Sequence, residues 1–269
     1  MKSERILAQN GFAQSEIMLD LYDLKKVYPT PKGDYVVLEH LNLQVKKEEF
    51  ITIIGHSGCG KTTMLSMIAG LNPISGGGIS VLGNSIKGPG PDRGVIFQSP
   101  SLMPWMTALD NVMLGVNRVF SHATKKQKED ICKYYLHKVG LEGAFNKRAA
   151  ELSQGMQQRV GIARAFAIKP KVLLLDEPFG MLDSLTRGEL QDVLIEIWNK
   201  EKITAVMITH DVDEAIFLAD RVVMMTSGPS AKIGDMLTID FERPRTRKAV
   251  IEHDDYYKYR KYLIDFLEH

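Results

Sequence analysis

The chain has 269 residues, of which 44% are hydrophobic and 25% are charged, and its formal net charge is +1 at pH 7. These values are typical of a globular protein with one large domain or two modest ones. The near balance of charges argues against a nucleic-acid partner, which usually requires a clearly basic domain.

The cysteine content and the apolar runs bear on the redox compartment and on membrane insertion. The two cysteines, Cys59 and Cys132, cannot build a disulfide framework, which favours a reducing compartment. Residues 1–10 lack the apolar run of a secretory signal, and no stretch reaches the about 18 apolar residues that a membrane span requires. If the protein works at a membrane, we expect another subunit to hold it there.

Short apolar runs and helical patterns alternate along the chain. The runs predict buried strands at 50–54, 95–97, 172–175, 205–208 and 222–225. Helices are predicted at 62–69, 157–167, 185–200 and 212–218. Strands that are apolar throughout and alternate with helices indicate a parallel sheet covered on both faces, so the predicted fold class is α/β.

Two regions depart from this alternation. Residues 99–155 contain few strand-like runs and one polar helix candidate at 124–139, and they are interpreted as a helical insertion, with a long decorated loop as the alternative. The tail beyond Phe241 begins with a basic run at 243–248 and ends with the aromatic-rich stretch 256–266. That stretch either packs on its own domain, which we expect, or docks on a partner.

The sequence Gly55-His-Ser-Gly-Cys-Gly-Lys-Thr62 matches G-x-x-x-x-G-K-[ST] between a predicted strand and a predicted helix. Its glycines allow successive N–H groups to converge on phosphate oxygens, and the helix N-terminus adds a positive field. Lys61 would reach the β- and γ-phosphates, and the Thr62 hydroxyl would ligate Mg²⁺. The alternative interpretation of the loop is a flexible glycine-rich turn. Cys59 is interpreted as a small residue that fills the tight turn, and the alternative for it is a redox or metal role. The predicted ATP-binding residues here are Gly55, His56, Ser57, Gly58, Cys59, Gly60, Lys61, Thr62 and Thr63.

Two carboxylates end the predicted strand at 172–175. Asp176 is placed to hold Mg²⁺, and Glu177 is the candidate general base or orienter for the attacking water. An Asp-Glu pair could also be a surface turn, but Pro178 and the preceding phosphate loop favour the catalytic interpretation.

A further motif is Leu152-Ser-Gln-Gly-Met156. Together with the phosphate loop and the carboxylate pair, it makes the chain resemble the ATP-binding subunits of ABC transporters over essentially its whole length. In that family this signature segment completes the ATP site of the opposite subunit. Ser153 would offer a hydroxyl, Gly155 a bare N–H and the next helix its dipole to a γ-phosphate. Gln154 replaces a glycine that the family usually has, which leaves the hydrolysis rate open, and Met181 replaces a usual alanine.

Other positions follow the family order. The resemblance implies that Gln98 contacts Mg²⁺ or water, that Leu182-Asp183 crosses the dimer seam and that His210 contacts the γ-phosphate. Alone, His210 would be read as a structural histidine. Tyr28 is the match to the ring that stacks on adenine, with Tyr35 as the weaker candidate, and either could be plain packing.

The resemblance also implies an organisation and partners. It predicts one P-loop ABC ATPase domain at 18–250 with a mostly parallel sheet core, N-terminal antiparallel strands and the helical subdomain inserted at about 99–155, followed by a helical tail at 251–269. It implies ATP and Mg²⁺ as cofactors, a homodimer or a heterodimer with a related ATPase, a permease, a substrate-binding protein and a peripheral location on the cytoplasmic face of the inner (plasma) membrane.

Several stretches resemble the nitrate, bicarbonate and cyanate importers, which are related to the sulfonate and taurine importers. These stretches are 88–93, 102–105, 209–215 and 226–229. Two further stretches favour the nitrate type over the sulfonate type, namely 231–234 and 243–245. None of these residues would touch the transported anion. One rival hypothesis is a soluble non-transport ABC ATPase, which is disfavoured because such proteins usually carry paired cassettes or long coiled-coil insertions. The other is a P-loop kinase or regulator, which the signature segment and His210 disfavour.

Overall fold

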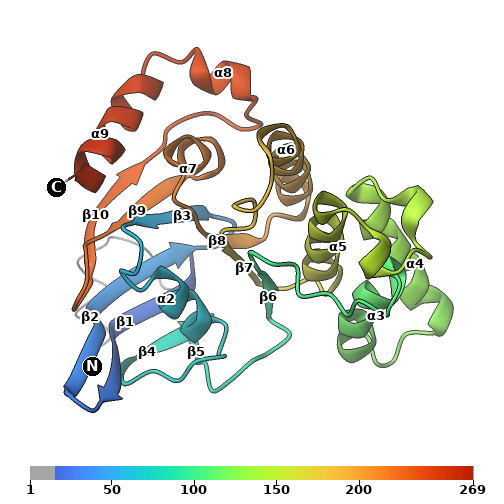
Figure 1. The fold of residues 1–269 in the computed structure, drawn as a ribbon, viewed down its shortest axis with the longest axis horizontal. Coiled ribbons are helices and arrows are strands. Elements are labelled where there is room, and N and C mark those ends of the chain that lie inside the picture. The colour runs from blue at the N-terminus through green and yellow to red at the C-terminus, as the bar shows by residue number, and fades with distance from the viewer. Residues whose placement is uncertain (1–15, 269) are drawn as a thin grey trace. The chain divides into compact units, whose positions relative to one another are not determined.

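The computed structural model describes residues 16–268 and divides them into two compact units. Unit 1 combines residues up to Pro89 with those from His210 onward, and unit 2 is Gly90–Thr209. Each unit has its own sheet strands and helices (Figure 1). Within the described part of the chain, no helix is both long and apolar enough to cross a membrane.

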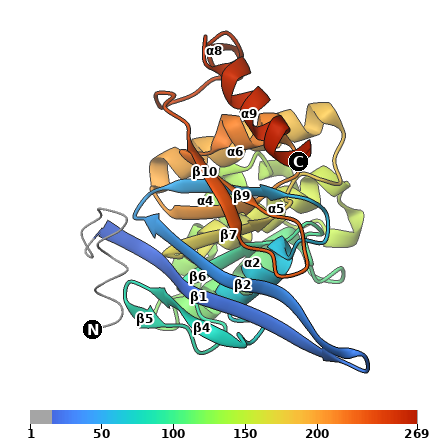
Figure 2. The ribbon, with the colours of Figure 1, turned by 90° about the vertical axis from the view of Figure 1, so that its left-hand side faces the viewer.

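Unit 1 begins with a long antiparallel hairpin formed by β1 (Ile17–Thr30) and β2 (Gly33–Lys46), whose length is clear in Figure 2. The strands β4 (Gly76–Val81) and β5 (Asn84–Ser85) continue this sheet in the order β2-β1-β4-β5. From Ile17 to Leu21, alternate residues of β1 face the core, as expected for a strand with one buried face. These strands match the predicted N-terminal antiparallel strands.

A second group of strands in unit 1 leads to the phosphate loop. β3 (Phe50–Gly55) runs parallel to β9 (Arg221–Met225), and β10 (Ile233–Thr238) pairs antiparallel with β9. All six residues of β3 are buried, which explains its uninterrupted apolar sequence. The helices of this unit are α2 (Lys61–Ile68), α7 (Val212–Leu218), α8 (Arg247–Ile251) and α9 (Tyr256–Glu268).

Unit 2 contains three parallel strands in the order β8 (Thr204–Ile208), β7 (Val172–Asp176) and β6 (Arg93–Ile96). Together with the parallel pair of unit 1, they confirm the predicted α/β class. The unit also contains α6 (Ser184–Glu201).

The remainder of unit 2 is helical. α3 (Ala108–Val119), α4 (Lys125–Lys138) and α5 (Gln154–Ala167) pack on one another, and the short 3₁₀ turns η2 (Glu142–Ala144) and η3 (Ala149–Glu151) connect α4 to α5. Residues 99–155 are therefore not a long loop. α3 was not predicted individually, and α5 begins three residues before its predicted start because Ser153 caps it.

Both cysteines lie inside the protein. Cys59 and Cys132 are both buried and free. Burial raises the pKa of the Cys132 thiol to about 12, so this thiol stays protonated and unreactive at neutral pH.

Candidate functional site

The phosphate loop connects β3 to α2 and depends on glycine at position 60. Gly60 has φ +100°, a left-handed conformation that side chains disfavour. A Cβ there would also lie 2.9 Å from side-chain atoms of Val37 and Leu38 on β2. The loop therefore lies directly against the β1–β2 hairpin, and the motif glycine allows this close approach.

Lys61 is the first residue of α2 and is 7% exposed. Its Nζ donates to the carbonyl oxygens of Gly55, at 2.8 Å, and His56, at 2.9 Å. The Sγ atom of Cys59 lies 3.9 Å from the same ammonium. The loop backbone thus holds the cation over the loop, at the position from which the motif predicts phosphate contact.

A loop distant in sequence supports the phosphate loop. Ser227 Oγ and His56 Nδ1 lie 3.1 Å apart, and a Cβ on Gly228 would approach the backbone of Gly58 and Cys59. This contact could not be predicted from the sequence, because Ser227 and His56 are 171 residues apart and no motif links them. Ser57, Gly58 and Thr62 are exposed, and Thr63 is half-buried.

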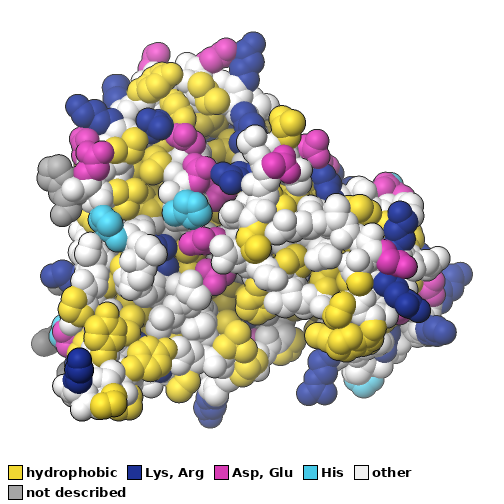
Figure 3. Space-filling view, viewed as in Figure 1, with side chains coloured by type: hydrophobic (Ala, Val, Ile, Leu, Met, Phe, Trp, Pro, Cys, Tyr) yellow, Lys and Arg dark blue, Asp and Glu magenta, His cyan; other side chains and the backbone are white. Residues whose placement is uncertain are grey.

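Tyr28 and Tyr35 are cross-strand partners on β1 and β2 and therefore share one face of the hairpin. The Lys26 ammonium lies 4.5 Å from the centre of the Tyr28 ring, and the Tyr28 hydroxyl accepts a hydrogen bond of 2.7 Å from Asn72. Both tyrosines are well exposed, at 39% and 48%. Figure 3 shows hydrophobic side chains gathered in the lower left, where Figure 1 places β1 and β2.

In unit 2 the two carboxylates end β7. Asp176 is its last residue, and Glu177 follows with φ +43°. The Glu177 N–H still donates to the Ile208 carbonyl at 3.1 Å, so the neighbouring strand β8 fixes this backbone. A left-handed glutamate costs on the order of 1 kcal/mol, and such strain is concentrated at functional sites. The Gln98 amide lies 3.4 Å from Glu177 Oε2, so the structure brings together two residues that the sequence predicted separately.

The signature segment, residues 152–156, forms the start of α5. Ser153 is the N-cap, and its Oγ accepts a hydrogen bond of 3.3 Å from the Met156 N–H. Ser153 and Gln154 are exposed. A Cβ on Gly155 would lie 2.8 Å from Thr186 Cγ2 on α6, so glycine is also favoured here by helix packing.

The flank of α5 holds the backbone that follows β6. Gln158 Nε2 donates to the Phe97 carbonyl at 3.2 Å, and Arg164 donates to the carbonyls of Pro100, at 2.7 Å, and Ser101, at 3.0 Å. Burial lowers the pKa of Arg164. The sequence analysis assigned no role to Gln158 or Arg164. Their polarity on a mostly buried helix was the available signal.

His210 is exposed and lies two residues before the first residue of α7, next to the N-cap Asp211. Asp211 caps this helix by accepting from the N–H groups of Asp213, at 2.9 Å, and Glu214, at 3.0 Å. Asp183 caps α6 in the same manner, and the Thr186 N–H that it accepts lowers the pKa of Asp183. The helices that follow Glu177 and His210 thus both begin with an aspartate side-chain cap.

The predicted Mg²⁺ ligands fit the ion by their chemistry. Thr62, Gln98 and Asp176 offer hydroxyl, amide and carboxylate oxygens, the hard donors that Mg²⁺ prefers. Among residues 16–268 there is no group of three or more His, Cys, Asp or Glu that could hold a metal. In phosphate-transfer sites Mg²⁺ generally takes further ligands from phosphate and water.

Comparisons with known proteins identify the family. The family model described as "ABC transporter" matches residues 38–180. The dimeric structure of MJ0796, a bacterial ABC transporter cassette, superposes with a TM-score of 0.75 at 30% identity and covers 84% of this chain and 100% of that one. The chain therefore belongs to the ABC transporter family, as an ATP-binding and ATP-hydrolysing subunit.

Three curated relatives refine this placement. The bicarbonate transport ATP-binding protein CmpD of Synechocystis sp. is 50% identical over 99% of this chain and 95% of its own length. The nitrate import ATP-binding protein NrtD of Synechococcus elongatus is 51% identical over 90% of this chain and 88% of its own length. The bicarbonate transport ATP-binding protein CmpC of Synechocystis sp. is 52% identical over 91% of this chain, which spans 37% of that longer protein.

Proposed function

We propose that this chain hydrolyses ATP to drive import of bicarbonate, nitrate or a related small anion such as cyanate or a sulfonate. The observation that carries the proposal is the 50% identity to a bicarbonate transport subunit across 99% of this chain. The similar identity to a nitrate import subunit supports the anion class but does not separate the two solutes. The transported anion would contact other subunits, so its class is inferred from likeness alone.

The phosphate loop is assigned to the triphosphate. Residues 55–63 present backbone N–H groups at the start of α2, and Lys61 exchanges loop carbonyls for β- and γ-phosphate oxygens when nucleotide binds. Thr62, Gln98 and Asp176 would hold Mg²⁺, which neutralises phosphate charge when bound. Tyr28 would stack on adenine. This assignment of Tyr28 is supported by the close approach of β2, the strand paired with β1, to the phosphate loop at Gly60.

Glu177 is assigned to the attacking water. A carboxylate within hydrogen-bond reach can accept its proton or orient it, and Gln98, 3.4 Å from Glu177, would hold the same water. Pairing with Ile208 fixes the Glu177 backbone, so the carboxylate is preorganised by the sheet rather than by a flexible loop. His210 would contact the γ-phosphate and keep this geometry.

The complete site is proposed to need two ATPase subunits arranged head to tail. Ser153, Gln154 and Gly155 of one subunit would close over the nucleotide held by the other, and Asp183 would lie at the seam. ATP then holds the dimer together, and loss of the γ-phosphate releases it. Either a second copy or a longer CmpC-like relative could supply the other half.

Domain limits, partner subunits and cellular location are also proposed. The domain limits of 18–250, with a helical subdomain at about 99–155 and a tail at 251–269, stay predictions. We expect a permease, a substrate-binding protein and a peripheral position on the cytoplasmic face of the inner membrane. Residues 98–105 would meet the permease. Trp105 is 69% exposed there, as a residue covered by a partner would be in an isolated subunit.

The deciding variant is Glu177→Gln. ATP should still bind and dimers should accumulate in size-exclusion chromatography, while phosphate release falls by about two to four orders of magnitude. Glu196→Gln is the matched control, because Glu196 is exposed and forms an ion pair with Lys200 one turn away on α6, an interaction of small energy. Normal turnover by Glu177→Gln would remove the assignment of the base.

The transport function is tested separately by affinity purification from membranes. An importer subunit should co-purify with an integral membrane protein, and bicarbonate or nitrate with the binding protein should stimulate the ATPase of the complex. Recovery of the active ATPase without any membrane protein would instead favour a soluble ABC ATPase.

A further inference from the structure

The C-terminal segment, residues 241–268, holds both ends of α7, the helix that follows His210. We propose that this segment is a positioning element for His210, acting through α7. The inference rests on the proposed function, because it takes His210 as a γ-phosphate contact. It gives a role to an aromatic tail that the phosphate-binding and hydrolysis assignments leave unused.

The N-terminal end of α7 is held by α9. Tyr256 Oη and Arg260 Nε both donate to Asp213 Oδ1, each at 2.8 Å. Tyr256 is buried, and burial together with the bond to Asp213 raises the pKa of its hydroxyl to about 12. The bond to Asp213 also raises the pKa of Arg260. Both groups therefore keep their protons, and their bonds to Asp213, across neutral pH.

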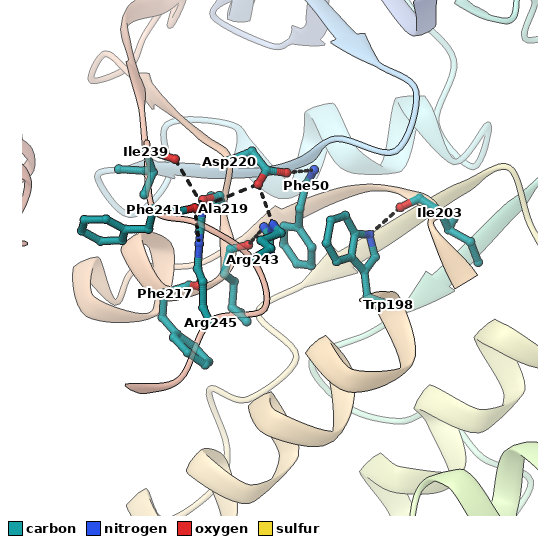
Figure 4. Close-up of polar contacts among 11 residues, drawn as sticks. Phe50, Trp198, Ile203, Phe217, Ala219, Asp220, Ile239, Phe241, Arg243 and Arg245 are labelled. Carbon is teal, nitrogen blue, oxygen red and sulfur yellow. Dashed lines mark hydrogen bonds and ion pairs between the residues drawn. The ribbon is translucent and has the colours of Figure 1, made fainter. Parts of the chain in front are cut away.

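The C-terminal end of α7 is held by the segment that enters α8 and α9. Arg245, with a side chain 2% exposed, donates to the carbonyls of Phe217 and Ala219 (Figure 4). These are carbonyls that a helix end leaves without partners. Arg243 donates to the Leu218 carbonyl at 2.6 Å and to Asp220 at 2.7 Å. Burial lowers the pKa of Arg245 to about 10, which still leaves it charged at neutral pH.

The held helix touches the strand that leads to the phosphate loop. α7 packs on β3, and Asp220, just past its end, accepts a hydrogen bond of 2.9 Å from the Phe50 N–H. With both ends held, a helix of seven residues has little freedom to shift along or turn about its axis.

The path from Asp213 to His210 is short. Asp211 lies between them and accepts hydrogen bonds from the Asp213 and Glu214 N–H groups. A displacement of the Asp213 backbone would therefore reach the backbone of His210 through one capped turn. Tyr256 and Arg260 are positioning residues in this account, since they act on the site only through Asp213.

The test is the double variant Tyr256→Phe with Arg260→Gln in the full chain. The matched control is Tyr262→Phe with Lys258→Gln. Tyr262 also lies on α9 and bonds to Asp235 of β10, and Lys258 pairs with Asp255 at the start of α9. We expect the first pair to lower kcat about three- to thirtyfold with little change in KM, because orientation is lost while binding is kept. The control pair should leave kcat within about twofold.

Two further readouts separate positioning from simple support. In a His210→Ala background, the Tyr256/Arg260 changes should cause no further loss of kcat, because the effects of substitutions that act through the same residue are not additive. In ¹⁵N-histidine-labelled protein, the His210 ring signal, assigned by its absence from His210→Ala, should shift or broaden in the test variant but not in the control.

Three outcomes would overturn the inference. The first is an equal loss of kcat in the test and control variants. The second is a loss of kcat from the Tyr256/Arg260 changes that is as large in the His210→Ala background as in the unaltered chain. The third is a His210 ring signal that does not change in the test variant. Full activity of His210→Ala would refute the role of His210 itself and this inference with it. Absence of ATP hydrolysis in the unaltered chain would refute the proposed function instead.

Discussion

The phosphate loop and the signature segment both lead into a helix, yet the two helix starts differ. α2 begins after a left-handed glycine, Gly60, and no side-chain hydrogen bond caps it. α5 begins after Ser153, whose hydroxyl accepts from the backbone in the ordinary way. The first N–H groups of a helix need acceptors, so the start of α2 is suited to an anion, whereas the start of α5 is partly satisfied by its own chain. The difference agrees with the proposal that the phosphate loop binds phosphate within its own subunit, whereas the signature segment completes the site of another subunit.

The largest effect is expected for Lys61→Ala. Removing the ammonium that the loop carbonyls hold should lower ATP hydrolysis by about a thousandfold and weaken nucleotide binding. Exposed Lys32 supplies the control, Lys32→Ala. Measured hydrolysis close to that of the unaltered chain would show that the loop is a glycine-rich turn rather than a phosphate site.

The next effect compares two glycines. Gly60→Ala should destabilise the fold by about 2–4 kcal/mol, because the left-handed φ and the contacts with Val37 and Leu38 both oppose a Cβ. Gly155→Ala should change stability by less than about 1 kcal/mol, because alanine favours the helix and partly offsets the contact with Thr186. Urea unfolding measures both. Equal losses would contradict the distinction between the two helix starts.

A smaller stability change separates the cap of α5 from its proposed role toward nucleotide. Ser153→Ala should cost about 1 kcal/mol of stability, and Ser153→Asp should restore it because aspartate caps equally well. The aspartate would repel a γ-phosphate, so ATP hydrolysis should stay low in both variants. Recovery of hydrolysis together with stability in Ser153→Asp would mean that Ser153 acts only as a cap.

The smallest effect is expected for Gln154→Gly, which restores the usual family residue. Gln154 is exposed in the first turn of α5, so glycine should cost at most about 1 kcal/mol. Turnover should change by less than about threefold. A large increase in kcat would show that Gln154 limits the rate in this chain.

Fully buried strands were the most predictable part of the fold. β3, β7, β8 and β9 agree with their apolar runs to within one residue at either end, because a strand covered on both faces has no polar positions to interrupt the pattern. The residue positions of β1 were not predicted. Its alternation is broken by register shifts between Leu21 and Val27, which displace the apolar residues from a simple two-residue period.

The candidate site was predictable where its chemistry is local in sequence. The phosphate loop, the carboxylate pair and the signature segment each occupy a few consecutive residues. The contacts of Ser227 with His56, of Gln158 with Phe97 and of Tyr256 with Asp213 join segments 43 to 171 residues apart. Such pairs follow from tertiary packing, and a single sequence contains no local pattern that specifies them.

The polar flank of α5 has a mechanical consequence for unit 2. Gln158 holds the carbonyl of Phe97, and Arg164 holds the carbonyls of Pro100 and Ser101. The two bonds from the charged Arg164 contribute about 1.5–3 kcal/mol each. At ordinary temperature these bonds rarely break together, so the main chain leaving Gln98 and the helix starting at Ser153 must travel as one piece. A displacement at either end is then transmitted along the helix without any rearrangement of the sheet.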